Sequence, residues 1–172
     1  MDALSRLDGM PEAEARAAFL RCCGSQRWAA AMSAGRPYRE AAALFAAAEV
    51  HWNGLGREDW LEAFGHHPRI GDGDGLRAGF AATRAWAASE QAGARAADGA
   101  VQGALAEGNR RYEARFGHIF IVCASGRSAE AMLAGLEARL GNDPDQELRI
   151  AAAEQAKITQ LRLEKLLAEV TA

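Results

Sequence analysis

The chain has 172 residues, and 20 Lys and Arg against 23 Asp and Glu give it a formal charge of −3. This slightly acidic balance argues against nucleic acid as a bulk partner, because phosphate binding needs a concentrated basic surface. No apolar run approaches the roughly 20 residues that span a bilayer. Residues 1–16 also lack the basic start and apolar stretch of a signal peptide. We therefore expect neither nucleic-acid nor membrane partners.

The composition favours one folded, helical domain over residues 1–172. Hydrophobic residues make up 49% of the chain, and many of them are alanine, which has the highest intrinsic helix propensity. The three cysteines, Cys22, Cys23 and Cys123, do not form a disulfide framework and are expected to be reduced thiols. The C-terminus lacks an SKL-type peroxisomal address, so we expect a cytoplasmic protein.

The pattern of start and stop residues predicts helices along most of the chain. Pro11 opens the first predicted helix, Ser25 and Ser128 are expected to cap two others, and Pro144 opens the last and longest. The predicted helices cover residues 11–23, 25–33, 38–52, 58–64, 80–97, 100–116, 128–140 and 144–170.

Two stretches break this helical pattern. Residues 66–79 contain a proline and several glycines, which predicts a long loop, and long loops in compact domains are usually functional. Residues 118–124 are rich in β-branched and aromatic side chains and predict a short, buried extended segment. A single extended segment cannot build a sheet, so the predicted fold class is an all-α, single-domain helical bundle.

Arg162 lies on the apolar face of the last predicted helix. An arginine there must pair with an anion or reach water, because an unpaired buried charge is costly. The pattern leaves open a structural salt bridge or a side chain that extends to solvent. At 100° per residue its face also contains Leu148, Ala151, Gln155, Ile158 and Leu166.

Glu90 and His67 are candidates for proton transfer. Glu90 shares its helical face with small and apolar residues, so it either lines a cavity, where burial would raise its pKa, or faces solvent. His67 is kept out of helical geometry by Pro68, and histidine is the commonest general acid or base. A loop histidine with no catalytic role is the alternative. The same periodicity predicts that Gln91 faces solvent.

Metal binding is the obvious competing interpretation of the loop. The spacing of its histidines and aspartates matches neither HExxH nor paired CxxC, and a calcium loop beginning at Asp72 would have Thr83 where the bidentate glutamate belongs. We therefore predict no metal site. The potential ligands are His51, His66, His67, Asp72 and Asp74.

Four motifs in this order resemble the 2-oxo-4-hydroxy-4-carboxy-5-ureidoimidazoline (OHCU) decarboxylases. The motifs are HPRIGD at 67–72, SEQAG at 89–93, NRRYEARFGHIFIVCASGRS at 109–128 and ITQLRLEKL at 158–166. The resemblance extends over nearly the whole chain. It implies a cofactor-free, all-helical enzyme for the last step from urate to (S)-allantoin, with a small-molecule substrate and a homodimeric state.

The resemblance also implies the site residues. The histidine before proline is His67 and its acidic partner is Glu90, while the adjacent Gln91 would bind substrate although its helical face is predicted to be polar. The main chain of the extended segment is expected to bond the substrate ring. The resemblance thus implies that His67 and Glu90 are catalytic and that the substrate-binding residues are Pro68, Gln91, Phe120, Ile121, Val122 and Arg162.

One position departs from the family pattern. Many members carry a serine three residues before the glutamate, where this chain has Ala87, so a substrate hydrogen bond is either lost or supplied by water. Ala87 is the one feature that favours the alternative of a non-catalytic, all-α ligand-binding or interaction module on the same scaffold. A metal-dependent hydrolase that uses the histidine loop is a further alternative. The decarboxylase interpretation requires His67, Glu90 and Arg162 to meet in one cleft.

Overall fold

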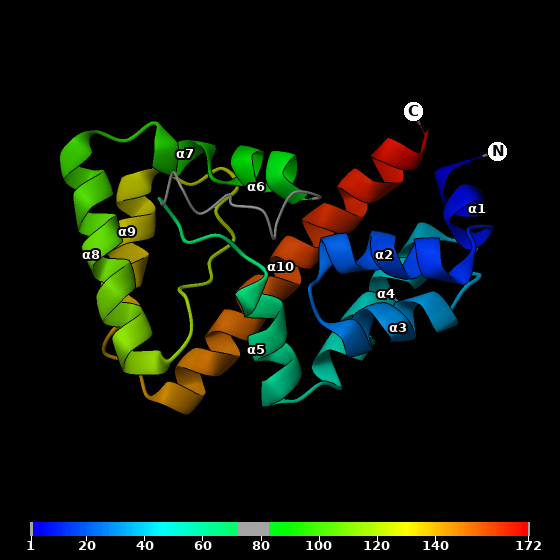
Figure 1. Ribbon diagram of the computed structural model, residues 1–172, viewed down its shortest axis with the longest axis horizontal. Coiled ribbons are helices and arrows are strands. Elements are labelled where there is room, and N and C mark those ends of the chain that lie inside the picture. Colours follow the sequence, from blue (N-terminus) through cyan, green and yellow to red (C-terminus); the bar gives the residue numbers. More distant parts are fainter. Residues whose placement is uncertain (1, 72–82, 172) are drawn as a thin grey trace. The chain divides into compact units, whose positions relative to one another are not determined.

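A computed structural model describes residues 2–71 and 83–171, in which ten helices and no strand are found (Figure 1). This confirms the predicted all-α class. In this described part of the chain, every helix falls short of the length or the apolar character that a membrane span requires. The helices are α1 (Ala3–Asp8), α2 (Glu12–Cys22), α3 (Gln26–Ala34), α4 (Ala41–Asn53), α5 (Arg57–Gly65), α6 (Arg84–Glu90), α7 (Ala92–Arg95), α8 (Gly99–Phe116), α9 (Ala129–Arg139) and α10 (Pro144–Thr171).

Short polar side chains set several helix starts. Asp2, Ser25, Asp98 and Ser128 each accept a hydrogen bond from the backbone N–H three residues on, at α1, α3, α8 and α9. Ser25 and Ser128 are the caps that the sequence predicts. At the other end of α8, Gly117 takes a left-handed conformation with φ of 75°, which a glycine adopts without steric cost.

Two helices in the first part of the chain differ from the prediction. The short α1 was not predicted, and α4 begins at Ala41 rather than at Tyr38. Tyr38 is held outside the helix because its N–H donates to Asp8 and its hydroxyl donates to the Met32 carbonyl. Arg39 has a positive φ of 62°, which a helix cannot contain. Local side-chain contacts therefore override the helical pattern at this point.

The predicted helix over 80–97 is instead two short helices, α6 and α7, separated at Gln91. Gln91 has φ of −98° and ψ of 15°, outside helical geometry. Residues 72–82 lie outside the described residues, so the predicted loop is described only at 66–71, where the chain forms turns and irregular structure. Residues 118–124 are also neither helix nor strand, and all but Ile119 and Cys123 are buried.

The described chain divides into two compact units, residues 1–63 with 156–172 and residues 64–155. In the first unit α2 packs against α3, and the Phe19 and Trp28 rings meet edge to face with centroids 6.0 Å apart (Figure 1). Cys22 and Cys23 are buried thiols in this core. Burial raises the pKa of both thiols, that of Cys23 to about 12, so neither is a reactive thiolate near neutral pH.

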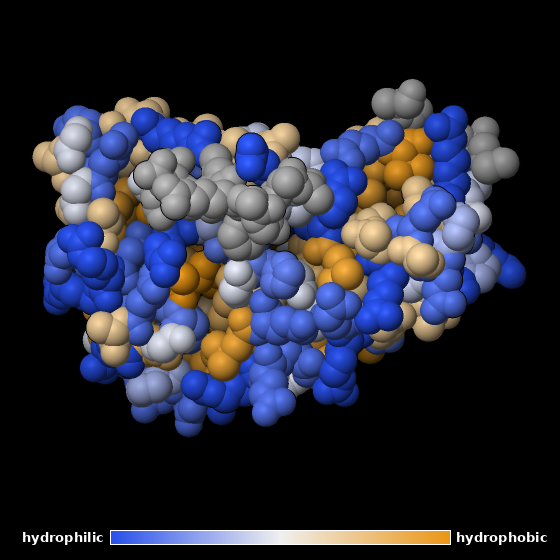
Figure 2. Space-filling model, viewed as in Figure 1, coloured by the Kyte–Doolittle hydropathy of each residue, from blue (hydrophilic) through white to orange (hydrophobic). Residues whose placement is uncertain are grey.

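The second unit has its core between α8, α9 and the segment 118–124. Helices α8 and α9 lie side by side (Figure 1), and a Cβ added at Gly108 would lie only 2.8 Å from Leu136. Hydrophilic residues predominate on the surface over α8, at the left of Figure 2. The core residues are Ile70, Ala94, Leu105, Tyr112, Phe116, Phe120, Val122, Ala124, Ala129, Met132 and Leu136.

Gly93, the last residue of the SEQAG motif, permits a close backbone contact. A Cβ at this position would lie 2.0 Å from the Arg127 carbonyl oxygen, a distance that real Cβ atoms do not reach. We expect Gly93→Ala to force α7 away from this turn and to lower the free energy of unfolding by about 1–3 kcal/mol. Urea titration followed by far-UV circular dichroism measures the change.

Gly103 provides the matched control for this substitution. It lies inside α8, and a Cβ there would meet no other atom within 4 Å. Gly103→Ala should therefore leave stability unchanged or raise it by up to roughly 1 kcal/mol, because alanine favours the helix. If both substitutions changed the free energy of unfolding equally, the close backbone contact at Gly93 would not contribute to stability.

Candidate active site

His67 lies two residues beyond the end of α5 and is fixed through both its backbone and its ring. Its backbone N–H donates to the Phe64 carbonyl at 3.1 Å, and its ring nitrogen Nε2 lies 2.6 Å from Oε1 of Gln155 in α10. The side chain is half-buried, whereas Gln155 is fully buried. An amide oxygen can only accept a hydrogen bond, so this contact is a hydrogen bond in the tautomer that carries a hydrogen on Nε2.

Gln91 brings the SEQAG motif against the HPRIGD motif. Its Nε2 donates to the Pro68 carbonyl at 3.4 Å, and its side chain is buried. The helix break between α6 and α7 accounts for this, because it removes Gln91 from the polar face on which an unbroken helix would place it. The periodicity-based prediction of a solvent-facing Gln91 was therefore wrong. Glu90, the last residue of α6, is half-buried beside it, and Ala87 is buried.

The next two loop residues are held by α8. Arg69 forms a two-pronged ion pair with Glu113, with Nε and Nη2 at 2.5 Å and 2.9 Å from the two carboxylate oxygens. Asn109 is buried, and its Nδ2 donates to the Ile70 carbonyl at 2.8 Å. Each residue from His67 to Ile70 thus has its own partner elsewhere in the second unit.

The segment that contains Phe120, Ile121 and Val122 is buried and is held from two helices. From α9, Arg139 donates to the Ile121 carbonyl at 2.8 Å and lies over the Phe120 ring, 4.5 Å from its centroid. From α10, Glu154 accepts a hydrogen bond from the Cys123 N–H at 2.8 Å. Glu154 and Gln155 are consecutive, so one turn of α10 contacts both this segment and His67.

A buried polar network supports Arg139 in turn. Glu147 of α10 is fully buried, and its carboxylate accepts from Nε of Arg139 at 2.7 Å and from Nδ2 of Asn142 at 2.8 Å. The Tyr112 hydroxyl also donates to Glu147. Burial, followed by this hydrogen bond, raises the pKa of Tyr112 far above its ordinary value, so the phenol stays protonated and continues to donate.

Arg162 belongs to the first unit and is described with it. Its side chain lies in α10, is only 3% exposed, and donates from Nη1 to the Arg21 carbonyl at 3.4 Å. The sequence left open whether this arginine pairs inside the protein or extends to solvent, and the structure shows that it is buried. Its convergence with His67 and Glu90 in one cleft stays a prediction.

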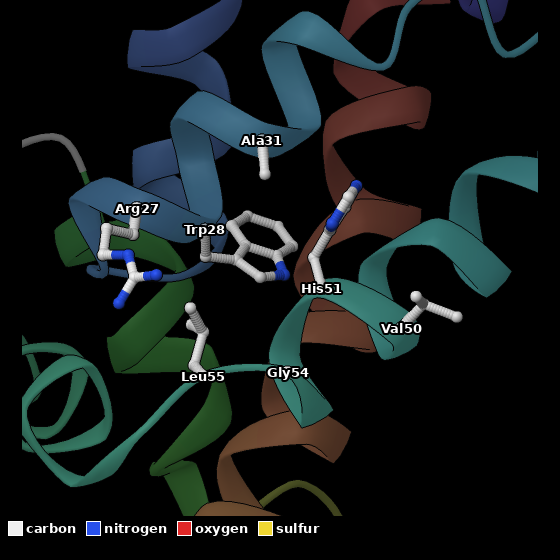
Figure 3. Close-up of a pocket in the computed structure, with 7 residues that line it drawn as sticks. All are labelled: Arg27, Trp28, Ala31, Val50, His51, Gly54 and Leu55. Atoms are coloured by element: carbon white, nitrogen blue, oxygen red, sulfur yellow. The ribbon is translucent and has the colours of Figure 1, made fainter.

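A surface pocket of about 250 Å³ lies within the first unit, between α3 and α4. Figure 3 shows the Trp28 indole between Arg27 on one side and His51 on the other. None of the predicted site residues lines this pocket. His51, one of the potential metal ligands named above, lines this pocket, while Asp72 and Asp74 lie outside the described residues.

Several residues that hold the site were missed from the sequence. Gln155 was assigned to an apolar face without a role, although a glutamine on such a face is itself a signal of a buried partner. Glu154, Asn109 and Glu113 gave no such local signal, because their partners are far away in the chain. Their contacts with Cys123, Ile70 and Arg69 become visible only in three dimensions.

The fold and these contacts define an all-α protein whose loop histidine is positioned by a buried amide, an arrangement suited to acid–base chemistry. The family model for OHCU decarboxylase matches residues 8–164. The chain therefore belongs to the OHCU decarboxylase family.

Two curated relatives agree with this assignment. The chain is 42% identical over 150 residues to the "Uric acid degradation bifunctional protein TTL" of Arabidopsis thaliana, a match covering 86% of this chain and 46% of that protein. It is 32% identical over 142 residues to the 2-oxo-4-hydroxy-4-carboxy-5-ureidoimidazoline decarboxylase of Amia calva, covering 81% of this chain and 79% of that protein. The chain thus spans about half the length of the Arabidopsis protein.

Solved structures give the same picture. A crystal structure of OHCU decarboxylase in the presence of (S)-allantoin superposes with a TM-score of 0.75 at 37% identity, covering 87% of this chain and 96% of that one. A crystal structure of (S)-allantoin synthase matches with a TM-score of 0.68 at 20% identity, over 95% of this chain and 53% of that one. At that identity the second likeness supports the fold alone.

Proposed function

We propose that this chain is a carboxy-lyase that converts 2-oxo-4-hydroxy-4-carboxy-5-ureidoimidazoline to (S)-allantoin and CO2 in urate degradation. The observation that carries the proposal is the position of His67 in the HPRIGD motif, where the buried amide of Gln155 holds its imidazole. The chain's membership of the OHCU decarboxylase family gives this geometry its meaning. The similarity to the Amia calva decarboxylase and to the solved OHCU decarboxylase supports the same reaction.

The substrate supplies its own electron sink. One ring carbon bears both a carboxylate and a hydroxyl, next to an imine-like carbon that bears the ureido group. When the C–C bond to the carboxylate breaks and CO2 leaves, its electron pair forms a C=C bond to the ureido-bearing carbon, and the C=N π electrons move to the ring nitrogen, which takes a proton from solvent. The hydroxyl group of this enol then loses its proton as the carbonyl forms. Protonation of the ureido-bearing carbon from one face then gives (S)-allantoin. The protein has to supply orientation, electrostatic stabilisation and one directed proton.

We assign the proton transfers to His67, which would accept the hydroxyl proton and return a proton to carbon. Glu90 would orient His67 or hold an N–H of the ureido group or ring. Its half-buried position beside Gln91 supports a role close to the HPRIGD motif. A carboxylate or imidazole that transfers a proton in this way typically raises the reaction rate by about 10²–10⁴-fold.

The remaining site residues would bind the substrate. Arg162 would hold an anionic group of the substrate through charge-assisted hydrogen bonds, a role supported by its burial and its place in the ITQLRLEKL motif. Pro68 and Gln91 would line the site, and the main chain at Phe120, Ile121 and Val122 would read the amide-like edges of the ring. Ala87 offers no hydroxyl, so water would supply that hydrogen bond.

A cytoplasmic homodimer that acts without metal or cofactor completes the proposal. Its support is the family resemblance together with ligand spacings that match no zinc or calcium motif. Nothing in it requires a nucleic-acid partner.

The decisive experiment follows freshly prepared substrate by circular dichroism with and without the protein. With the protein, we expect CO2 release to be faster and the circular dichroism signal of (S)-allantoin to grow. Spontaneous decay should give racemic product and no such signal. EDTA should leave the rate unchanged. Loss of activity on chelation, restored by zinc, would instead support the metal-dependent hydrolase. A rise in melting temperature with allantoin but no CO2 release would support the non-catalytic module.

A further inference from the structure

We propose that Gln155 is a positioning residue that fixes His67 in its Nε2-protonated tautomer and so makes Nδ1 the nitrogen that exchanges a proton with substrate. The inference rests on the proposed function for its catalytic meaning, but the tautomer itself is a property of the protein without substrate. The observation behind it is the contact of 2.6 Å between Nε2 of His67 and Oε1 of Gln155.

The burial of Gln155 makes the contact selective. Its side chain has no solvent exposure, and in the described residues every buried side-chain nitrogen or oxygen has a hydrogen-bond partner. A ring without a hydrogen on Nε2 would place two acceptors against each other, with the amide of Gln155 buried away from solvent. The cost of an unfavourable contact at a buried polar group is enough to favour one tautomer by about fivefold or more.

A glutamine suits this position better than a carboxylate would. Its amide oxygen accepts from Nε2 as a carboxylate does, but it carries no charge and does not stabilise the imidazolium as strongly. The ring therefore keeps one orientation and one tautomer and can still return its proton. A histidine that must both take and give a proton in one cycle needs this balance.

Glu154, the residue before Gln155, has a similar role for the segment 118–124. Glu154 accepts from the Cys123 N–H and is itself buried, so it holds the segment next to Ile121 while Gln155 holds His67. Two consecutive residues of α10 thus fix both the proposed acid–base group and the proposed substrate-reading main chain. Because one turn of helix carries both, these two anchors are fixed relative to each other.

The test uses nitrogen NMR of the histidine rings, in which protonated and unprotonated ring nitrogens resonate far apart. In the wild-type protein at a pH where the rings are neutral, His67 should show a protonated Nε2 and an unprotonated Nδ1. The spectrum of His67→Asn identifies its signals among the four histidines. In Gln155→Met, which keeps the length of the side chain but removes the acceptor, we expect a mixture of tautomers.

The kinetic result should separate positioning from binding. Gln155→Met should lower kcat by roughly 10–100-fold, the usual range for a residue that orients a ligand or catalytic group, with KM little changed. Gln155→Glu restores an acceptor at the same place and should return the Nε2-protonated tautomer. Gln160→Met, an exposed glutamine of the same helix, should change neither the spectrum nor the rate.

Two results would overturn the inference. One is a Gln155→Met protein in which His67 stays entirely protonated on Nε2. Should that variant fail to fold, the corresponding result is a Gln155→Glu protein in which His67 is not protonated on Nε2. The other is a lowered kcat in Gln155→Met with an unchanged tautomer, which would indicate a merely structural role. Failure of the proposed function is distinguishable, because the wild-type protein would then release no CO2 while its His67 signals still showed the fixed tautomer.

Discussion

Replacing His67 by alanine should lower the rate of CO2 release by about 10²–10⁴-fold, because the substitution removes the group that handles both protons. The fold should survive, since His67 is half-buried and belongs to a turn rather than to a helix. Steady-state rates measured on fresh substrate give the effect on activity. Far-UV circular dichroism and thermal melting report whether the helices remain.

His66→Ala is the matched control, because His66 is the exposed neighbour of His67 in the same turn. It removes a side chain of the same type from the same stretch of chain, and the rate should stay within about twofold of the wild type, as for other exposed substitutions. Full activity of His67→Ala would remove His67 from the mechanism. Equal losses in the two variants would point to a general disturbance of the loop.

Replacing Glu147 by alanine should lower the free energy of unfolding by about 3–5 kcal/mol, the usual cost of removing one partner of a buried ion pair. The substitution leaves the Arg139 guanidinium, whose side chain is 12% exposed, without its carboxylate. It also removes the acceptor of the Tyr112 hydroxyl. Urea titration followed by circular dichroism measures the loss.

Glu107 offers the contrasting case, since it pairs with Arg110 one turn away on the surface of α8. Exposed pairs contribute little, so Glu107→Ala should change stability by no more than about 1 kcal/mol. Because Arg139 holds the Ile121 carbonyl, Glu147→Ala should also lower activity in conditions where it stays folded. A Glu147→Ala protein as stable as Glu107→Ala would refute the structural role of the network.

Fold class and most helices were predictable because they depend on local chemistry. Ser25 and Ser128 cap helices through bonds to residues three positions away, and Gly117 ends one in a conformation natural to glycine. The exceptions arise where distant contacts outweigh local preference. Tyr38 would fit the helix that follows it, but its hydrogen bonds to Asp8 and Met32 hold it outside.

The candidate site shows the same division more sharply. His67 and Pro68 form a recognisable pair in the sequence, and the unusual place of Arg162 is visible on a helical wheel. Gln91 was misplaced by periodicity because an ideal helix was assumed where the chain breaks. Gln155 lies 88 positions from the histidine it contacts, and no pattern of spacing joins two such residues.

The separate anchoring of residues 67–70 has a consequence for protein engineering. Their partners are Gln155 in α10, Gln91 at the break between α6 and α7, and Glu113 and Asn109 in α8. A loop grafted from a relative would lose these anchors unless the recipient already carried matching residues at all four places. Because residues 67–70 are already anchored, most of the entropic cost of ordering them is incurred when the protein folds rather than when substrate binds. Chimeras that exchange the loop alone should therefore be slower catalysts than chimeras that exchange the loop together with its anchors.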